Sequence, residues 1–290
     1  MVVTAGFFDG VHIGHRRVLD VLLGTGEAAA VVTFWPHPRI VLQKDADTLS
    51  LLDSLEEKEA GLRAAGVGDI RLVEFTKEFA ALSAESFIRH YLMDGMGCTH
   101  LVLGPDNRFG SDAFDTEAIA SLASSMGLKT SIVEPVIMGG AAVSSTRIRA
   151  ALAAGDIESA NRMLGYDYGL SGTVVPGNRL GRTIGFPTAN VRPSFPLKAV
   201  PANGVYATRV TVDGNVHIGM TNIGVRPTVG GGGGRTIETN IFDFDEEIYG
   251  KEIRIEFVSR VRNEQCFPSM QKLAGQLAQD KKIILYICKQ

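Results

Sequence analysis

The chain has 290 residues, more than one hydrophobic core usually organises, and this length predicts about two domains. Hydrophobic residues make up 45% of it, but no apolar run reaches the roughly 20 residues that a membrane-spanning helix needs, so we expect no membrane association. The formal net charge of −3 gives no broad positive surface for nucleic acid, and phosphorylated small molecules are the better-fitting partners.

The start of the chain and its cysteines predict a cytoplasmic protein. The first ten residues lack the basic region, apolar core and small-residue cleavage site of a secretory signal. Cys98, Cys266 and Cys288 are scattered and form no CxxC pair, so neither a disulfide framework nor a structural zinc site is expected.

Strand and helix patterns alternate over residues 1–165, which predicts crossover units and a parallel sheet with helices on both faces. Ligands of such sheets bind beyond the carboxyl ends of the strands. The expected strands are Val2–Gly6, Ala28–Trp35, Ile70–Phe75, Thr99–Gly104 and Lys129–Val136. The expected helices are His15–Leu23, Ser54–Ala65, Ser83–Met93, Thr116–Met126, Ser145–Ala154 and Ile157–Leu164.

Residues 166–290 read as β structure and predict a second domain, a barrel or a sandwich. The dipeptide Asp213-Gly214 predicts a two-residue hairpin turn. Residues 230–234 are five consecutive glycines, which suit a mobile flap or a featureless surface loop. The expected strands are Leu170–Val175, Gly204–Val212, Asn215–Gly224, Thr236–Phe244 and Glu252–Val261, followed by a terminal helix over Ser269–Tyr286.

Two histidines, His12 and His15, flank Gly14 where the first strand gives way to a helix. Free backbone N–H groups and the helix dipole make such a turn an anion site, and two imidazoles add further donors for phosphate oxygens. These hydrogen-bond donors suit nucleotidyl transfer at an α-phosphate, where negative charge develops on the bridging oxygen and on the departing pyrophosphate. A histidine that merely caps or packs is the alternative, and HxGH also fits class I aminoacyl-tRNA synthetases.

A second segment, Ser144–Arg149 (SSTRIR), opens a predicted helix directly after a glycine-containing loop. Its hydroxyls and N–H groups can face phosphate, with Arg149 as a cation on the same side. A plain helix N-cap is the alternative for the serines. The lysine-rich KMSKS loop of the synthetases is absent from the sequence, which disfavours a role with tRNA.

GFFDGVHIGH and VSSTRIR together resemble the adenylyltransferase module of the bacterial bifunctional riboflavin kinase/FAD synthetase family. The resemblance implies a Rossmann-like nucleotidyltransferase domain over residues 1–165, with His12 and His15 as its catalytic residues. It also implies that ATP and its phosphates are bound by Gly6, Phe8, Gly14, Ser145, Thr146 and Arg149.

Two further segments resemble the flavin side of that module. TFWPHPR (Thr33–Arg39) is similar to a strand-end loop of the family, which implies flavin contacts for His37, Phe34 and Trp35. Its prolines predict an extended loop, and a buried aromatic cluster is the alternative role of Phe34 and Trp35. GPDNRFG (Gly104–Gly110) is similar to the family's GxDFxFG, with Asp106 at the nucleotide or flavin position and Asn107 in place of an aromatic residue.

In the second half of the chain, the segment Gly177–Asn190 (GNRLGRTIGFPTAN) contains several glycines, Arg182, Thr188 and Asn190. Such a loop suits phosphates, and its hydroxyl and amide oxygens suit Mg²⁺ bound with a nucleotide; a glycine-rich connection between strands is the alternative. GRxxGFPTAN resembles the riboflavin kinase motif, which implies an antiparallel β-barrel with a terminal helix. By this resemblance Gly181 and Arg182 bind ATP phosphates, and Thr188 and Asn190 orient Mg²⁺ with ATP.

Glu238 is implied to be the general base that accepts the proton of the ribityl hydroxyl; an exposed strand carboxylate is the alternative. The leading hypothesis is a two-step enzyme that uses ATP and Mg²⁺ to phosphorylate riboflavin to FMN and then to adenylylate FMN to FAD. The alternatives are a riboflavin kinase with weak or absent adenylyltransferase activity, and a flavin-binding regulatory protein. The expected partners are riboflavin, FMN and ATP, without nucleic acid, for a monomer or weak homo-oligomer.

Overall fold

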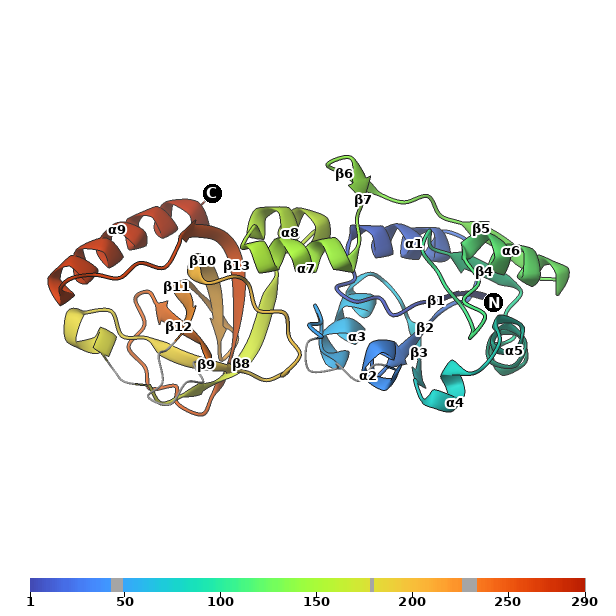
Figure 1. Ribbon diagram of the computed structural model, residues 1–290, viewed down its shortest axis with the longest axis horizontal. Helices are drawn as coiled ribbons and strands as arrows, with labels where there is room; N and C mark the ends of the chain where they lie inside the picture. Colours follow the sequence, from blue (N-terminus) through green and yellow to red (C-terminus); the bar gives the residue numbers. More distant parts are fainter. Residues whose placement is uncertain (43–48, 178–179, 226–233, 290) are drawn as a thin grey trace. The chain divides into compact units, whose positions relative to one another are not determined.

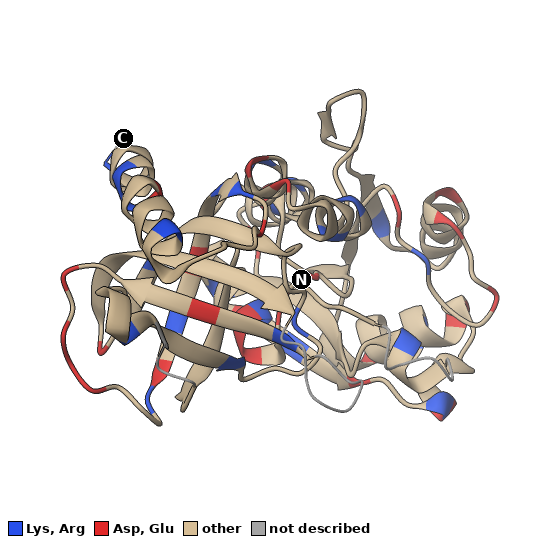
Figure 2. Ribbon diagram, turned by 60° about the vertical axis from the view of Figure 1, so that its left-hand side comes forward, with Lys and Arg blue, Asp and Glu red and all other residues tan. Residues whose placement is uncertain are grey.

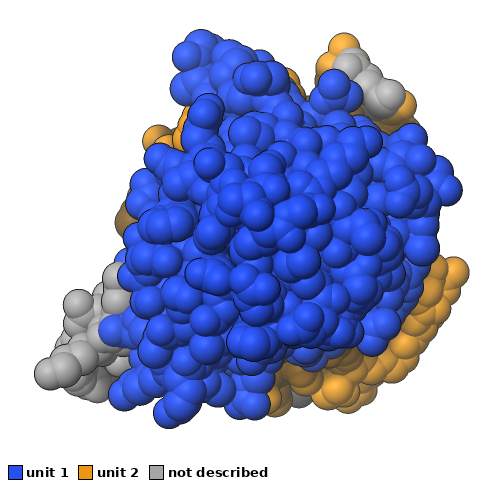
Figure 3. All heavy atoms as spheres, turned by 90° about the vertical axis from the view of Figure 1, so that its right-hand side faces the viewer, with its two compact units in different colours: residues 1–145 blue, residues 146–290 orange. Residues whose placement is uncertain are grey.

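The structure is a computed structural model that describes residues 1–42, 49–177, 180–225 and 234–289 (Figure 1). The chain forms two compact units, Met1–Ser145 and Thr146–Gln290, which Figure 3 distinguishes by colour. The sequence instead places the domain boundary after residue 165. Helices α7 (Ser145–Ala154) and α8 (Ile157–Leu164), which have the bounds expected from the sequence, account for the difference.

Unit 1 contains a five-stranded parallel sheet in the order β3-β2-β1-β4-β5, as the alternating pattern predicts. Central β1 pairs with β2 on one side and with β4 on the other. The strand order therefore reverses at the carboxyl ends of β1 and β4, where ligands of open α/β sheets bind. The strands are β1 (Val2–Ala5), β2 (Ala29–Trp35), β3 (Asp69–Glu74), β4 (His100–Leu103) and β5 (Lys129–Ile132).

Successive strand residues point to opposite faces of the sheet, and both faces are buried at the central strands β1 and β4. Val2 packs with Leu19 and Leu62 from α1 (Ile13–Leu23) and α3 (Leu55–Ala64). Val3 packs on the other face with helices α5 (Ala84–Ser86), η2 (Phe87–Asp94) and α6 (Thr116–Ser125). The two cores hold the strand ends at fixed positions.

Local structure differs from the sequence-based expectation at four places in unit 1. The predicted helix Ser83–Met93 is one α-helical turn followed by the π-helix η2. The predicted strand Lys129–Val136 stops at Ile132, and a small hairpin of β6 (Ile137–Met138) and β7 (Ala141–Ala142) follows. The loop predicted to be extended becomes helix α2 (Pro38–Leu42), since the fixed φ of proline suits a first helical position; α4 (Lys77–Ala80) was also not predicted.

Unit 2 contains a closed antiparallel barrel in the order β10-β11-β12-β9-β8-β13, which decides between the predicted barrel and sandwich. The sequence did not predict β9, which is short and ends in a proline. Asp213 and Gly214 both have positive φ, as their hairpin requires. The elements are β8 (Gly169–Val175), the 3₁₀ helix η3 (Leu180–Ile184), β9 (Ala189–Pro193), β10 (Gly204–Val212), β11 (Asn215–Val225), β12 (Arg235–Ile241) and β13 (Glu252–Arg262).

The terminal helix α9 (Met270–Cys288) covers one side of the barrel. Its Ile284 packs with Val205 and Ala207 of β10. An ion pair of 2.8 Å joins Arg262, at the end of β13, to fully buried Asp280 of α9. Acidic and basic residues are interspersed along the described chain (Figure 2).

Candidate active sites

The first candidate site lies at the carboxyl end of β1, where the chain turns into α1. His12 is the N-cap of α1, and its Nδ1 accepts a hydrogen bond from the backbone N–H of His15 at 3.2 Å. A neutral imidazole that accepts through Nδ1 carries its proton on Nε2. His12 therefore offers an N–H donor beside the first-turn N–H groups of the helix, which together favour an anion.

His15 stacks on His12, with ring centroids 3.6 Å apart and planes 13° from parallel. Burial, and after it the charge of His12, hold the pKa of His15 well below its ordinary value. Its Nδ1 is buried without a hydrogen-bond partner among the described residues. Buried polar atoms nearly always have a hydrogen-bond partner, so a ligand oxygen is the expected partner of this nitrogen.

A side chain larger than hydrogen between the two histidines would crowd His12. A Cβ on Gly14 would come within 3.1 Å of Cε1 and Nδ1 of His12. Phe8 supports His15 from the other side, with its ring edge-on to the imidazole at a centroid distance of 5.2 Å. The same ring leaves only 3.2 Å for a Cβ on Gly6. Three of the predicted ATP-binding residues thus position the histidines by packing.

The turn between β1 and His12 has an unusual backbone. Phe8 and Val11 have φ of 55° and 33°, in the left-handed region that costs a non-glycine residue about 1–3 kcal/mol. Two buried carboxylates hold this turn in place. Asp9 accepts hydrogen bonds from two backbone N–H groups just before α3, at 2.9 and 3.2 Å, and Asp53 accepts one from Gly10 at 2.9 Å. Sequence reasoning assigned nothing to either aspartate.

The predicted SSTRIR segment begins α7 as expected. Ser145, its first residue, donates a hydrogen bond of 2.8 Å to the backbone carbonyl of Asp9, which ties the segment to the strained turn. Thr146 and Arg149 follow on the same helix in unit 2, and Arg149 donates to the Thr146 hydroxyl at 3.3 Å. Their contact with phosphates stays a prediction.

The three predicted flavin contacts near the end of β2 lie in different surroundings. His37 meets the edge of Phe7 at 4.3 Å between ring centroids, and Phe7 is nearly parallel to Trp35 at 6.1 Å. These three rings are partly exposed and offer a surface to a planar ligand. Phe34, also partly exposed, instead contacts the rings of Phe75, Phe79 and Phe87 and packs against the hydrophobic core.

At the carboxyl end of β4, Asp106 is exposed, and the neighbouring Asn107 joins two strands. The Asn107 side chain accepts a hydrogen bond from the N–H of Gly104 at 2.6 Å and donates one to the carbonyl of Ala5 at 2.9 Å. It therefore bridges the ends of β4 and β1 where the strand order reverses. The sequence marked Asn107 only as a departure from the family pattern.

The second candidate site lies on three neighbouring barrel strands. Glu238 of β12 is directly opposite Asn190 of β9 and Asn222 of β11, so the three residues form a row on one face. Glu238 is partly exposed, whereas Asn190 is buried at 9% exposure. Thr188 lies two residues before Asn190. The barrel thus places the predicted base opposite Asn190, one of the two predicted Mg²⁺ ligands.

The glycines of the predicted phosphate loop pack closely around this row. A Cβ on Gly177 would come within 2.1 Å of Nδ2 of Asn190, and one on Gly181 within 2.1 Å of the carbonyl oxygen of Phe186. Arg182 is exposed on η3. Asn240 donates a hydrogen bond of 2.6 Å to the carbonyl of Pro187 and so fixes the backbone just before Thr188.

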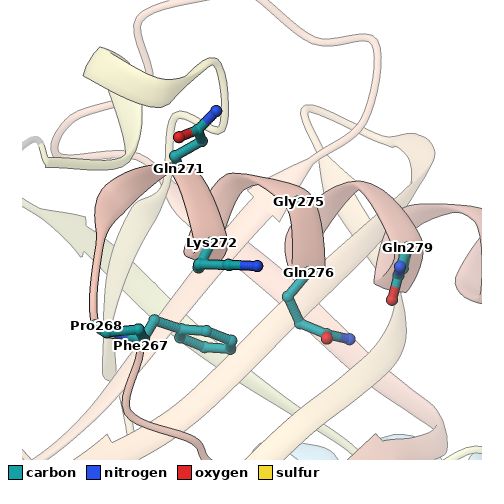
Figure 4. A pocket seen from close by; sticks show the side chains of 7 residues that line it. All are labelled: Phe267, Pro268, Gln271, Lys272, Gly275, Gln276 and Gln279. Carbon is teal, nitrogen blue, oxygen red and sulfur yellow. The ribbon is translucent and has the colours of Figure 1, made fainter.

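Part of the predicted barrel site lies outside the described residues. Residues 178–179 and 226–233, which include most of the glycine run, belong to this part. A groove along the first half of α9 was not predicted. Figure 4 shows the ring of Phe267 beneath Lys272 and Gln276 in this groove. Gln276 also donates to Asp280 at 2.9 Å, which connects the groove to the buried ion pair with Arg262.

Two family models match separate parts of the chain, FAD synthetase over residues 1–147 and riboflavin kinase over residues 164–287. The bifunctional riboflavin kinase/FMN adenylyltransferase of Bacillus subtilis (strain 168) is 37% identical over 289 residues, which cover 97% of this chain and 90% of the relative. The chain belongs to the bifunctional riboflavin kinase/FMN adenylyltransferase family. The family protein from Escherichia coli (strain K12) is also 37% identical, over 288 residues, with the same shares covered.

A solved structure of a Streptococcus pneumoniae protein, titled a macrolide-efflux protein, has the same fold. It is 33% identical, with a TM-score of 0.90, and the match covers 98% of this chain and 93% of that one. In the part of the chain that the structure describes, no helix combines the length and apolar character needed to cross a bilayer. The first matched segment ends at residue 147 and the second begins at residue 164. Most of α7 and α8 lies between them.

Proposed function

We propose that this member of the riboflavin kinase/FMN adenylyltransferase family carries out its two reactions at two separate sites. The barrel would transfer the γ-phosphate of ATP to riboflavin, and unit 1 would transfer AMP from ATP to FMN, forming FAD and pyrophosphate. The observation that supports this proposal is that two separate groups of side chains lie on different units, the stacked pair His12 and His15 and the cross-strand row of Asn190, Asn222 and Glu238.

Adenylyl transfer at the first site needs positioned donors rather than a covalent intermediate. A phosphate oxygen of FMN attacks the α-phosphorus of ATP, the new P–O bond forms, and the bond to the β-phosphate oxygen breaks. His12 donates from Nε2 to phosphate oxygens. His15, which burial keeps neutral, forms the missing hydrogen bond of its Nδ1 with the ligand. Ser145, Thr146 and Arg149 would contribute at the pyrophosphate side.

In phosphoryl transfer at the second site, Glu238 would be the general base. Its carboxylate accepts the proton of the ribityl hydroxyl as the oxygen attacks the γ-phosphorus, and ADP leaves. Thr188 and Asn190 would supply neutral oxygen ligands for Mg²⁺ bound together with ATP. Mg²⁺ bound there would neutralise phosphate charge. Gly181 and Arg182 would contact the phosphates.

Flavin recognition in unit 1 is proposed for the exposed aromatic surface of Phe7, Trp35 and His37, with Asp106 across the sheet edge. The stacked geometry of Phe7 and Trp35 supports this assignment, because offset parallel rings accept a third planar group. Phe34 would act indirectly, as the core residue beneath the end of β2. A cytoplasmic location, a monomeric or weakly associated state and independence from nucleic acid stay predictions from the sequence.

A chromatographic time course tests the proposed function. Purified protein is incubated with riboflavin, ATP and Mg²⁺, and riboflavin, FMN and FAD are followed together. The proposal predicts that FMN appears first and then converts to FAD. Accumulation of FMN without FAD would support the alternative of a kinase with an inactive unit 1. Flavin binding without any product would support the regulatory alternative.

A further inference from the structure

Lys58, in the second turn of α3, is almost completely buried, with 1% of its surface exposed. Its ammonium donates a hydrogen bond of 2.9 Å to the carbonyl of Phe34, near the end of β2. The same ammonium lies 4.0 Å from the ring centroid of Phe7 and 5.2 Å from that of Trp35. A single buried cation therefore contacts the end of β2 and two rings of the proposed flavin surface.

The charges that face Lys58 among the described residues come from three segments. They are Asp9 from the strained turn, Asp53 from the segment before α3, and Glu59 from α3 itself. Burial lowers the pKa of Lys58 to about 8, although these three carboxylates act to raise it. Asp9 and Asp53 are themselves buried, at 4% and 7% exposure.

We propose that Lys58 is a positioning residue for adenylyl transfer, whose positive charge keeps Asp9 and Asp53 ionised and so holds the strained turn that presents His12. The proposal rests on the proposed function of unit 1. Lys58 is too deeply buried to touch a substrate, and it acts through the two carboxylates and through Phe7 and Trp35.

The physical argument concerns the cost of two neighbouring buried carboxylates. Ionised carboxylates accept the backbone N–H groups that hold the turn, and a protonated carboxyl accepts them more weakly. Without a nearby cation, burial and mutual repulsion favour protonation of one aspartate. The left-handed conformations of Phe8 and Val11 persist only while the surrounding bonds maintain them. Loss of the Lys58 charge would therefore release the turn and displace His12.

This role predicts a pH dependence that a merely structural lysine would not produce. As the pH rises through about 8, Lys58 loses its proton and adenylyl transfer falls, whereas phosphoryl transfer in the barrel does not use this group. In Lys58→Arg the charge persists at every pH tested, and the alkaline fall moves out of this range. In Lys58→Met the charge is absent at every pH.

The test measures FAD formation from FMN and ATP, and separately FMN formation from riboflavin and ATP, from pH 6.5 to 9.5. We expect K58M to lower kcat/KM for FAD formation by on the order of 10- to 100-fold at pH 7, with a flat profile above it. K58R is expected to recover part of the rate and to lack the alkaline fall near pH 8. FMN formation should be unchanged in both, and Lys77→Met, which removes an exposed lysine of unit 1, should match the wild type.

Several outcomes would overturn the proposal. They are wild-type activity in K58M, an alkaline fall near pH 8 that persists in K58R, or a wild-type FAD rate that stays flat to pH 9.5. The flat wild-type profile would overturn the proposal even if both variants failed to fold. A wild type that forms no FAD at pH 7 overturns the proposed function of unit 1, and the role of Lys58 with it.

Discussion

The imidazole rings of His12 and His15 are stacked face to face, 3.6 Å between centroids, and the backbone N–H of His15 bonds to Nδ1 of His12. The backbone bond sets the tautomer of His12, and burial, followed by the neighbouring His12, holds the pKa of His15 below its ordinary value. His15 is therefore kept neutral beside the N–H donor of His12 before a nucleotide arrives.

Titration of His15 should respond to ATP. Without ligand its pKa lies below the ordinary value, because burial and His12 disfavour the charged form. Phosphate oxygens at the unpaired Nδ1 favour the charged form and should raise that pKa. Ring nitrogen NMR across pH measures both values, with His15→Gln to assign the signal. If ATP leaves the pKa of His15 unchanged, this nitrogen does not contact phosphate.

Replacing Gly14 by alanine should impair adenylyl transfer without destabilising α1. Alanine is the better helix former by about 1 kcal/mol, but its Cβ would press on the ring of His12 at 3.1 Å. We expect FAD formation to fall roughly tenfold or more, with FMN formation unchanged. Gly68→Ala, where a Cβ meets no atom within 4 Å, is the matched control. Full FAD formation in G14A would mean that the position of His12 is not critical.

Removing the amide of Asn107 should weaken the connection between β1 and β4. Asn107→Leu leaves the N–H of Gly104 and the carbonyl of Ala5 without their present partner, at a cost of about 1–3 kcal/mol if they stay buried. The expected result is a lower FAD rate and faster amide hydrogen exchange at Gly104. Unchanged exchange there would show that the bridge carries no stability.

Glu238→Gln should remove phosphoryl transfer and spare adenylyl transfer. The amide keeps the size of the side chain but cannot accept the proton of the ribityl hydroxyl. We expect FMN formation to fall by about 10²–10⁴-fold, while FAD formation from added FMN continues. Glu247→Gln, on an exposed segment, is the control. FMN formation at the wild-type rate in E238Q would exclude Glu238 as the base.

Sequence patterns predicted the architecture because long elements carry their own signal. The buried strands and the amphipathic helices of unit 1 follow from hydrophobic periodicity, and α7, α8 and β10 have the expected bounds. The motif HxGH indicated a phosphate site because it combines a helix start with two donors. These features depend on neighbours in the sequence, which a pattern can record.

Features that depend on distant contacts were not predictable. Lys58 and Asp53 read as ordinary charged residues around a surface helix, and only the fold brings them beside Asp9. Asn107 gains its role from Ala5, 102 residues away in the sequence. Phe34 illustrates the opposite case, since strand alternation sends it to the core cluster and leaves Trp35 beside Phe7.

The most direct test of two independent sites on one chain combines His15→Ala and Glu238→Gln. With riboflavin, ATP and Mg²⁺, H15A alone should stop at FMN, E238Q alone should leave riboflavin unconverted, and the mixture should form FAD. That result would assign one reaction to each site. Equal loss of both reactions in either folded variant, or a mixture that forms no FAD, would contradict the account.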